Sequence, residues 1–182
     1  MMDPIAASPR FQARIAGAFY LLNIVAGSLA AVFVGRYATY GRGAILFATA
    51  CYVVVTALLF CLFKPVSRGL SLLAAGFSLA GCAIGVLGSF HLVPSSINAL
   101  VFFGGYCVLI GSLILRSTFL PRVLGVLMLF AGLGWLTFLS PSLASHLSPY
   151  NLAPGVLGEG VLTLWLLLVG VNVRRWKEQA SV

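Results

Sequence analysis

Acidic residues are nearly missing from this sequence. Its 182 residues include three acids against eleven lysines and arginines, which gives a formal net charge of +8. Only 8% of the residues are charged, too few to cover the surface of a soluble domain. Asp3 and Glu178 lie in polar terminal segments, so Glu159 is the one acid within the hydrophobic body of the chain. Catalysis by paired carboxylates is therefore excluded from that body.

Motifs for catalysis and metal binding are also absent from the sequence. There is no G-x-S-x-G nucleophile elbow and no H-E-x-x-H zinc motif. The four cysteines form no C-x-x-C pair and all fall within hydrophobic runs, which is typical of packing residues. A non-enzymatic function is favoured, and no cofactor is predicted. The cysteines are Cys51, Cys61, Cys82 and Cys107.

Long apolar runs dominate what is present. The chain is 61% hydrophobic, and runs of about 20 residues, enough to cross a bilayer, recur along its length. This pattern predicts an all-α fold: one polytopic bundle of six transmembrane helices over residues 14–173. A short lead, 1–13, precedes the bundle and a basic tail, 174–182, follows it. The predicted helices cover residues 14–34, 44–63, 69–90, 96–115, 122–139 and 154–173.

The basic residues indicate how the bundle sits in the membrane. When loops alternate between two sides, nine basic residues fall on one side and two, Arg36 and Arg42, on the other. Basic residues accumulate on the cytoplasmic side, so both termini are predicted to be cytoplasmic, in the inner (plasma) membrane of a bacterium. Because the charges lie at helix ends and not on one face, the expected partner is the lipid bilayer and not nucleic acid. The nine are Arg10, Arg14, Lys64, Arg68, Arg116, Arg122, Arg174, Arg175 and Lys177.

Small residues predict close helix packing. Within 69–90, Ser78, Gly81, Gly85 and Gly88 are spaced three or four apart and share one helical face. Such faces let neighbouring backbones approach closely in lipid. They could serve contacts within the bundle, a protein partner or a homo-oligomer. Further small residues are Gly17, Gly27, Ala31, Gly104, Gly105, Gly111, Gly125 and Gly132.

Glu159 is the candidate functional residue. An ionisable group within a membrane span is costly and marks a functional site by default. Its position five residues after Pro154 places it nearer the outer end, and the flanking Gly158 and Gly160 allow a ligand or helix to come close. Other polar residues are predicted at the same end. They are Arg36, Arg42, His91, Asn98, His146 and Tyr150.

Three interpretations of Glu159 stay open at this point. It could line an outward-facing pocket that binds or transports a small cationic or polar solute. It could instead lock helices together, by pairing with Arg36 or Arg42 or by hydrogen bonding, in a structural subunit of a membrane complex. Thirdly, His91, His146 and Glu159 are ligand types that suit zinc, which would give a metal-dependent membrane enzyme.

Three segments together resemble a known family. They are the opening stretch 14–24, the turn 115–125 and the stretch 158–166, and they are similar to domain of unknown function 4386, a family of small bacterial multi-pass membrane proteins. The resemblance implies a membrane location and brings no established activity. It draws attention to Glu159 and Trp165 without assigning either a role.

Overall fold

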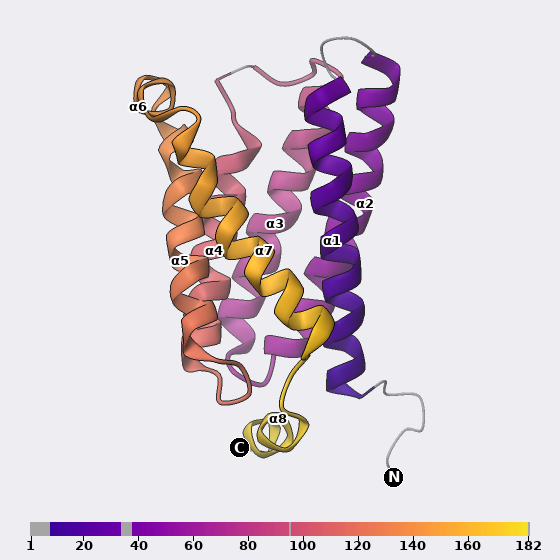
Figure 1. Cartoon of the computed structure of the whole chain (residues 1–182), viewed down its shortest axis with the longest axis vertical. Coiled ribbons are helices and arrows are strands. Elements are labelled where there is room, and N and C mark those ends of the chain that lie inside the picture. Colours follow the sequence, from indigo (N-terminus) through magenta and orange to yellow (C-terminus); the bar gives the residue numbers. More distant parts are fainter. Residues whose placement is uncertain (1–7, 34–37, 95, 182) are drawn as a thin grey trace.

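A computed structural model describes residues 8–33, 38–94 and 96–181. Within these residues all regular structure is helical (Figure 1). Six helices are long and apolar enough to cross a membrane, so the predicted all-α, six-span fold is confirmed and the chain is a multi-pass membrane protein. The elements are α1 Pro9–Phe33, α2 Ala38–Phe63, α3 Arg68–Ser89, α4 Ala99–Arg116, α5 Arg122–Leu136, the 3-10 turn Thr137–Leu139, α6 Pro141–Leu147, the 3-10 turn Tyr150–Leu152, α7 Ala153–Leu168 and α8 Val173–Ala180.

The six long helices form a ring. Each of α1 to α4 contacts the next helix along the chain, α5 contacts α7, and α7 contacts α1. α7 reaches both neighbours because it crosses the bundle obliquely (Figure 1). Its first half packs on α5, where a Cβ on Gly158 would collide with Leu127. Its second half packs on α1, where a Cβ on Gly17 would lie 2.6 Å from the Leu167 nitrogen. Glycine thus permits both close approaches.

Glycines also bring α4 and α5 together, as the small-residue pattern predicts. A Cβ on Gly111 would lie 2.8 Å from the Gly125 oxygen, and one on Gly132 would lie 2.9 Å from the Gly104 oxygen. In α3 the small residues contact two neighbouring helices: Gly81 faces the Phe103 ring of α4, and the Ser78 hydroxyl bonds to the Thr56 hydroxyl of α2.

The first two spans begin earlier than the hydropathy pattern predicts. α1 begins at Pro9 and not at residue 14, because the Ser8 side chain accepts a hydrogen bond from Phe11 N at 3.3 Å and proline suits the first helical position. α2 begins at Ala38 and not at residue 44. Gly41 and Gly43 suggest a loop in this segment. A helix can nevertheless contain glycine, at a free-energy cost of about 1 kcal/mol per residue relative to alanine.

The last span ends earlier than predicted. α7 stops at Leu168 and not at residue 173, because Gly170 adopts a φ of 76° and its N–H bonds back to the Trp165 carbonyl at 2.9 Å. The chain then turns, and Asn172 caps a separate helix, α8, by accepting from Arg175 N. The predicted basic tail is therefore helical and lies across the end of the bundle (Figure 1).

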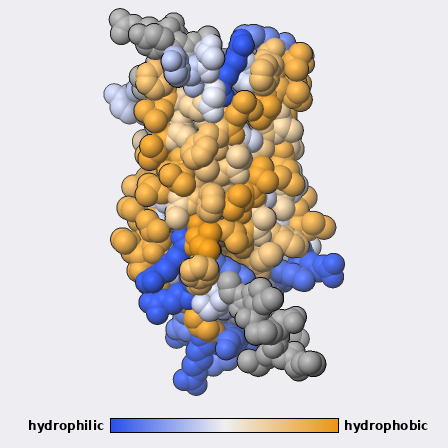
Figure 2. All heavy atoms as spheres, turned by 90° about the vertical axis from the view of Figure 1, so that its right-hand side faces the viewer, coloured by the Kyte–Doolittle hydropathy of each residue, from blue (hydrophilic) through white to orange (hydrophobic). Residues whose placement is uncertain are grey.

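The two ends of the bundle differ in charge. The start of α1, the α2–α3 and α4–α5 turns and α8 lie together, with all nine basic residues of the predicted cytoplasmic side; this is called the basic end. Figure 2 shows blue side chains gathered there, below a broad apolar belt. The opposite end carries α6 and the start of α7 (Figure 1). Which end faces the cytoplasm stays a prediction from the charge distribution.

Large buried side chains fill the bundle between its centre and the basic end. Tyr20, Tyr52 and Tyr106 meet edge to face, with ring centroids 5.5 Å apart for the first pair and 5.7 Å for the second. Nearer the basic end, large side chains such as Leu59 and Leu113 are fully buried. The centre of the ring is therefore filled on this side.

Candidate functional site

Glu159 lies on α7 and joins it to three other helices. Its Oε2 accepts a hydrogen bond from the Tyr20 hydroxyl of α1 at 2.8 Å. Its Oε1 accepts from the Trp135 indole N–H of α5 and, at 3.6 Å, from the Cys107 thiol of α4. Each of the three partners can donate a hydrogen bond to the carboxyl oxygens. The site thus surrounds an acid with neutral donors.

Gly155 explains how the Trp135 indole reaches Glu159. Gly155 and Glu159 are four residues apart on α7 and share one face of the helix. The indole lies directly on Gly155, where an added Cβ would overlap the ring. Only glycine leaves room for the ring there, and the ring then points its N–H toward the carboxylate one turn further along.

A cavity of about 540 Å³ lies beside Glu159 at the centre of the ring. The volume is within the range of small-molecule sites, about 300–1,000 Å³. Most of the lining is apolar, and the polar groups are few, as in such sites. The half-buried Glu159 is the only charged side chain among the lining residues. They are Asn23, Ile24, Gly27, Ser28, Ala30, Ile45, Ala48, Thr49, Tyr52, Gly81, Cys82, Gly85, Leu100, Phe103, Trp135, Leu152, Gly155, Val156 and Glu159.

Tyr52 is a further polar group of the cavity. Its side chain is 4% exposed, it lines the cavity, and its hydroxyl has no hydrogen-bond partner in the part of the chain that the structure describes. A buried hydroxyl without a partner is costly, and most such groups are satisfied. A bound molecule with a polar group would remove that cost.

The cavity lies on the side of the tyrosine cluster away from the basic end. Its α2 and α4 lining begins near the opposite end, at Ile45 and Leu100. Part of its wall is at the surface of the bundle, because Gly27 of α1 and Val156 of α7 line it and are exposed. The packed core closes the other side. Access is therefore from the half of the protein opposite the basic end.

The polar residues predicted to surround Glu159 have other positions. The Arg42 guanidinium lies over the Phe90 ring, 5.7 Å from its centroid. Asn98 caps α4 by accepting from Leu100 N at 3.0 Å. His91, His146 and Tyr150 are exposed at the opposite end, and none of these five lines the cavity.

No ion pair joins Glu159 to an arginine among the residues that the structure describes. Arg36, one of the two predicted partners, lies outside them. Trp165 is also separate from Glu159, since it lines a different cavity beside Gly170 at the basic end.

A metal site is not supported by the geometry. Within residues 8–33, 38–94 and 96–181, no three His, Cys, Asp or Glu side chains lie together in a position to hold a metal ion. His91, His146 and Glu159 therefore do not form the zinc site considered from the sequence.

Sequence reasoning missed the residues that do contact Glu159. The sequence pattern predicts Cys107 as a packing residue and singles out neither Tyr20 nor Trp135, because none of the three is charged. One signal could have found the first two: tyrosine and tryptophan inside a span need a partner for O–H or N–H. Glu159 is the only carboxylate available to them there.

Comparison with known proteins identifies similar sequences but no activity. The family described as "Domain of unknown function (DUF4386)" matches residues 96–170, which include Cys107, Trp135 and Glu159. An "Uncharacterized protein" of Archaeoglobus fulgidus is 30% identical over 127 residues, covering 65% of this chain and 76% of that protein. No solved structure matches.

Proposed function

The chain belongs to the domain of unknown function (DUF4386) family of multi-pass membrane proteins, and we propose that it binds a small amphiphilic solute in the cavity beside Glu159. The solute presents a cationic, hydrogen-bond-donating group to the carboxylate and an apolar part to the cavity walls. By the charge distribution, the protein lies in the plasma membrane with this cavity facing outward.

One observation carries the proposal: the only acid of the membrane body lines a cavity and has no cationic partner among the described residues. A carboxylate in a membrane is costly, and uncharged donors offset only part of that cost. The attraction between opposite charges is strong at low dielectric. A cationic solute therefore gains more from Glu159 than a neutral one.

The walls support the same class of solute. Tyr52, Phe103 and Trp135 line the cavity, and aromatic faces attract cations by about 0.5–2 kcal/mol. Ile24, Ile45 and other apolar side chains exclude strongly hydrated molecules. A small amine with an aromatic or aliphatic body fits both features.

A structural role for Glu159 is the alternative, and its hydrogen bonds to three helices favour it. The two functions predict different effects when a larger side chain fills the cavity. A Cβ on Gly27 would meet no atom within 4 Å, so a larger side chain there enters open space. Gly27→Leu should abolish binding and leave the Glu159 hydrogen bonds intact.

Trp135 serves as the reporter for this test. In a Trp165→Phe/Trp176→Phe background it is the only indole, and its N–H contacts Glu159. We expect 2-phenylethylamine to change its fluorescence saturably, and the neutral analogue 2-phenylethanol to bind more weakly. The response should be lost in Gly27→Leu and weakened in Glu159→Gln.

Gly76→Leu is the matched control, because Gly76 also has open space around it but lies outside the cavity. An unchanged amine response in Gly27→Leu, or an equal response to amine and alcohol, would contradict the proposal. Either result would leave Glu159 with the structural role.

A further inference from the structure

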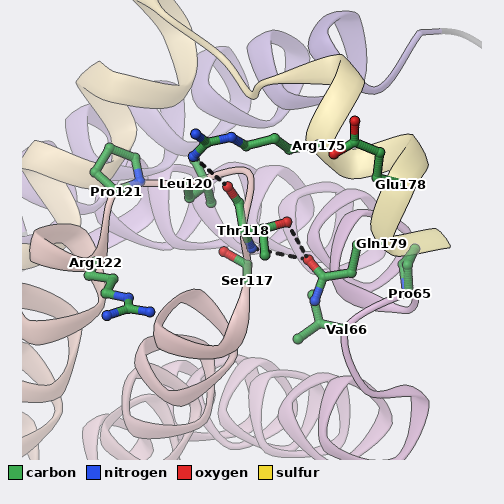
Figure 3. A pocket seen from close by; sticks show the side chains of 10 residues that line it. All are labelled: Pro65, Val66, Ser117, Thr118, Leu120, Pro121, Arg122, Arg175, Glu178 and Gln179. Carbon is green, nitrogen blue, oxygen red and sulfur yellow. Dashed lines mark hydrogen bonds between the residues drawn. The ribbon is translucent and has the colours of Figure 1, made fainter. Parts of the chain in front are cut away.

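A separate cavity of about 970 Å³ lies at the basic end, between α8 and the α4–α5 turn (Figure 3). It shares no residue with the cavity beside Glu159. Two guanidinium groups, several hydroxyl or amide groups and an apolar wall surround it. The lining residues are Pro65, Val66, Ser117, Thr118, Leu120, Pro121, Arg122, Arg175, Glu178 and Gln179.

Hydrogen bonds hold α8 in place against the bundle. Gln179 Oε1 accepts from the Thr118 N–H at 3.1 Å and from its hydroxyl at 3.2 Å, and Gln179 Nε2 donates to the Arg116 carbonyl. The Trp176 indole donates to the Leu62 carbonyl at 2.9 Å. α8 is therefore a fixed wall, and the cavity is built by contacts from both sides.

The charge at this cavity is positive. Arg122 from α5 and Arg175 from α8 reach the 117–121 turn from different sides (Figure 3). Glu178, the one acid in the lining, pairs with Arg174 at 3.0 Å. Arg175 donates one hydrogen bond, to the Thr118 carbonyl at 3.3 Å, and Arg122 makes none with any described residue. Most of the guanidinium donors therefore stay available, and their fork geometry suits phosphate oxygens.

The depth of the cavity in the membrane favours a lipid phosphate as the group that the two arginines would bind. α4 ends at Arg116 and α5 begins at Arg122, so the cavity lies where the spans leave the apolar belt and lipid headgroups begin. Its other wall is apolar, with Pro65, Val66 and Leu120. From Arg122 toward the bundle centre, the outward face of α5 is apolar and exposed, at Val123 and Val126, where acyl chains would lie.

We propose that this cavity binds the phosphate group of an anionic membrane lipid, held between Arg122 and Arg175, with its acyl chains along α5. Basic pockets between helices on the cytoplasmic side are suited to such headgroups. The site goes beyond solute binding at Glu159 and does not depend on it. A soluble phosphate ester has the same headgroup chemistry, and the test must separate the two sources.

The test uses the full chain in phosphatidylcholine nanodiscs, with or without phosphatidylglycerol. Two quantities are measured: the midpoint of thermal unfolding, and the number of phosphatidylglycerol molecules retained in native mass spectrometry. A lipid that binds only the folded state raises the midpoint. We expect phosphatidylglycerol to raise it for the wild type, and Arg122→Gln/Arg175→Gln to lose both the shift and the retained lipid.

Arg68→Gln/Lys177→Gln is the matched control. It removes the same charge, one of its two positions lies on α8 as Arg175 does, and neither position lines the cavity. We expect it to keep the shift. Arg122→Gln alone breaks no hydrogen bond among the described residues, so it reports on the site even where the double variant does not fold, and its retained lipid should fall.

Separate samples receive inorganic phosphate or glycerol 3-phosphate in phosphatidylcholine nanodiscs, and we expect no shift. Three results would overturn the proposal. The first is full lipid retention in the Arg122→Gln variant or the double variant. The second is an equal loss in the control, which would show a general surface-charge effect. The third is a soluble phosphate that reproduces the whole shift, which would make the ligand a soluble anion.

Discussion

The hydrogen bond from Trp135 to Glu159 can be measured with a double-mutant cycle. Trp135→Phe removes the N–H donor, and Glu159→Met removes the acceptor at similar side-chain length. Each single change also alters packing and desolvation, but these effects cancel when the double variant is compared with the two singles. The coupling that remains reports the interaction itself.

The structure sets the size of that coupling. The indole N–H donates to a carboxylate inside a membrane span. Hydrogen bonds to charged groups contribute about 1.5–3 kcal/mol in soluble proteins, whereas interhelical hydrogen bonds in a membrane average about 0.6 and reach about 1.7. A charged acceptor belongs at the upper end of the membrane range, so we expect a coupling of about 1–2 kcal/mol.

The assay is reversible unfolding in mixed micelles by titration with sodium dodecyl sulfate, read by circular dichroism. Trp165→Phe with Glu159→Met is the matched control, because Trp165 lines the other cavity, beside Gly170. Its coupling should stay within about 0.3–0.5 kcal/mol, as for independent sites. If the Trp135 cycle gave a value equally small, the hydrogen-bonded arrangement at Glu159 would be refuted.

Three further predictions test the packing and the orientation. Gly155→Ala places a methyl group on the indole and should cost about 1–3 kcal/mol of unfolding free energy, whereas Gly160→Ala, with no atom within 4 Å, should be neutral or stabilise by up to about 1 kcal/mol; equal effects would contradict the contact. Gly111→Ala separates α4 from α5 and should lower the thermal midpoint in detergent; an unchanged midpoint would show that the two helices are not closely packed there. In a variant without native cysteines, Ser148→Cys should react with an impermeant thiol reagent on intact cells and Ser181→Cys only after lysis, and the reverse would overturn the predicted orientation.

The number of spans could be predicted from the sequence because it depends on local properties. Apolar runs of membrane length specify where the chain crosses, whatever the neighbouring helices are. The exact ends of the helices depend on single residues whose effect a hydropathy pattern does not include. Ser8 and Pro9 extend the first helix, and the left-handed backbone at Gly170 ends the last span.

The position of Glu159 as the centre of interest could also be predicted, but its partners could not. A charge suggests an opposite charge, and the nearest candidates by depth were Arg36 and Arg42. The real partners are neutral, and the most distant in sequence, Tyr20, is 139 positions away. That contact exists because α7 crosses from α5 to α1, and nothing in the periodicity of a single helix specifies which helices pack together.

The most direct test of solute binding at Glu159 is to identify what the protein carries. Wild type, Gly27→Leu and the control Gly76→Leu are expressed and purified in parallel, and extracted small molecules are compared by mass spectrometry at equal protein amounts. The proposed function predicts an amine-containing molecule in the wild type and in Gly76→Leu that is depleted in Gly27→Leu, with all three proteins folded. The same small molecules in all three samples, at the same amounts, would contradict it.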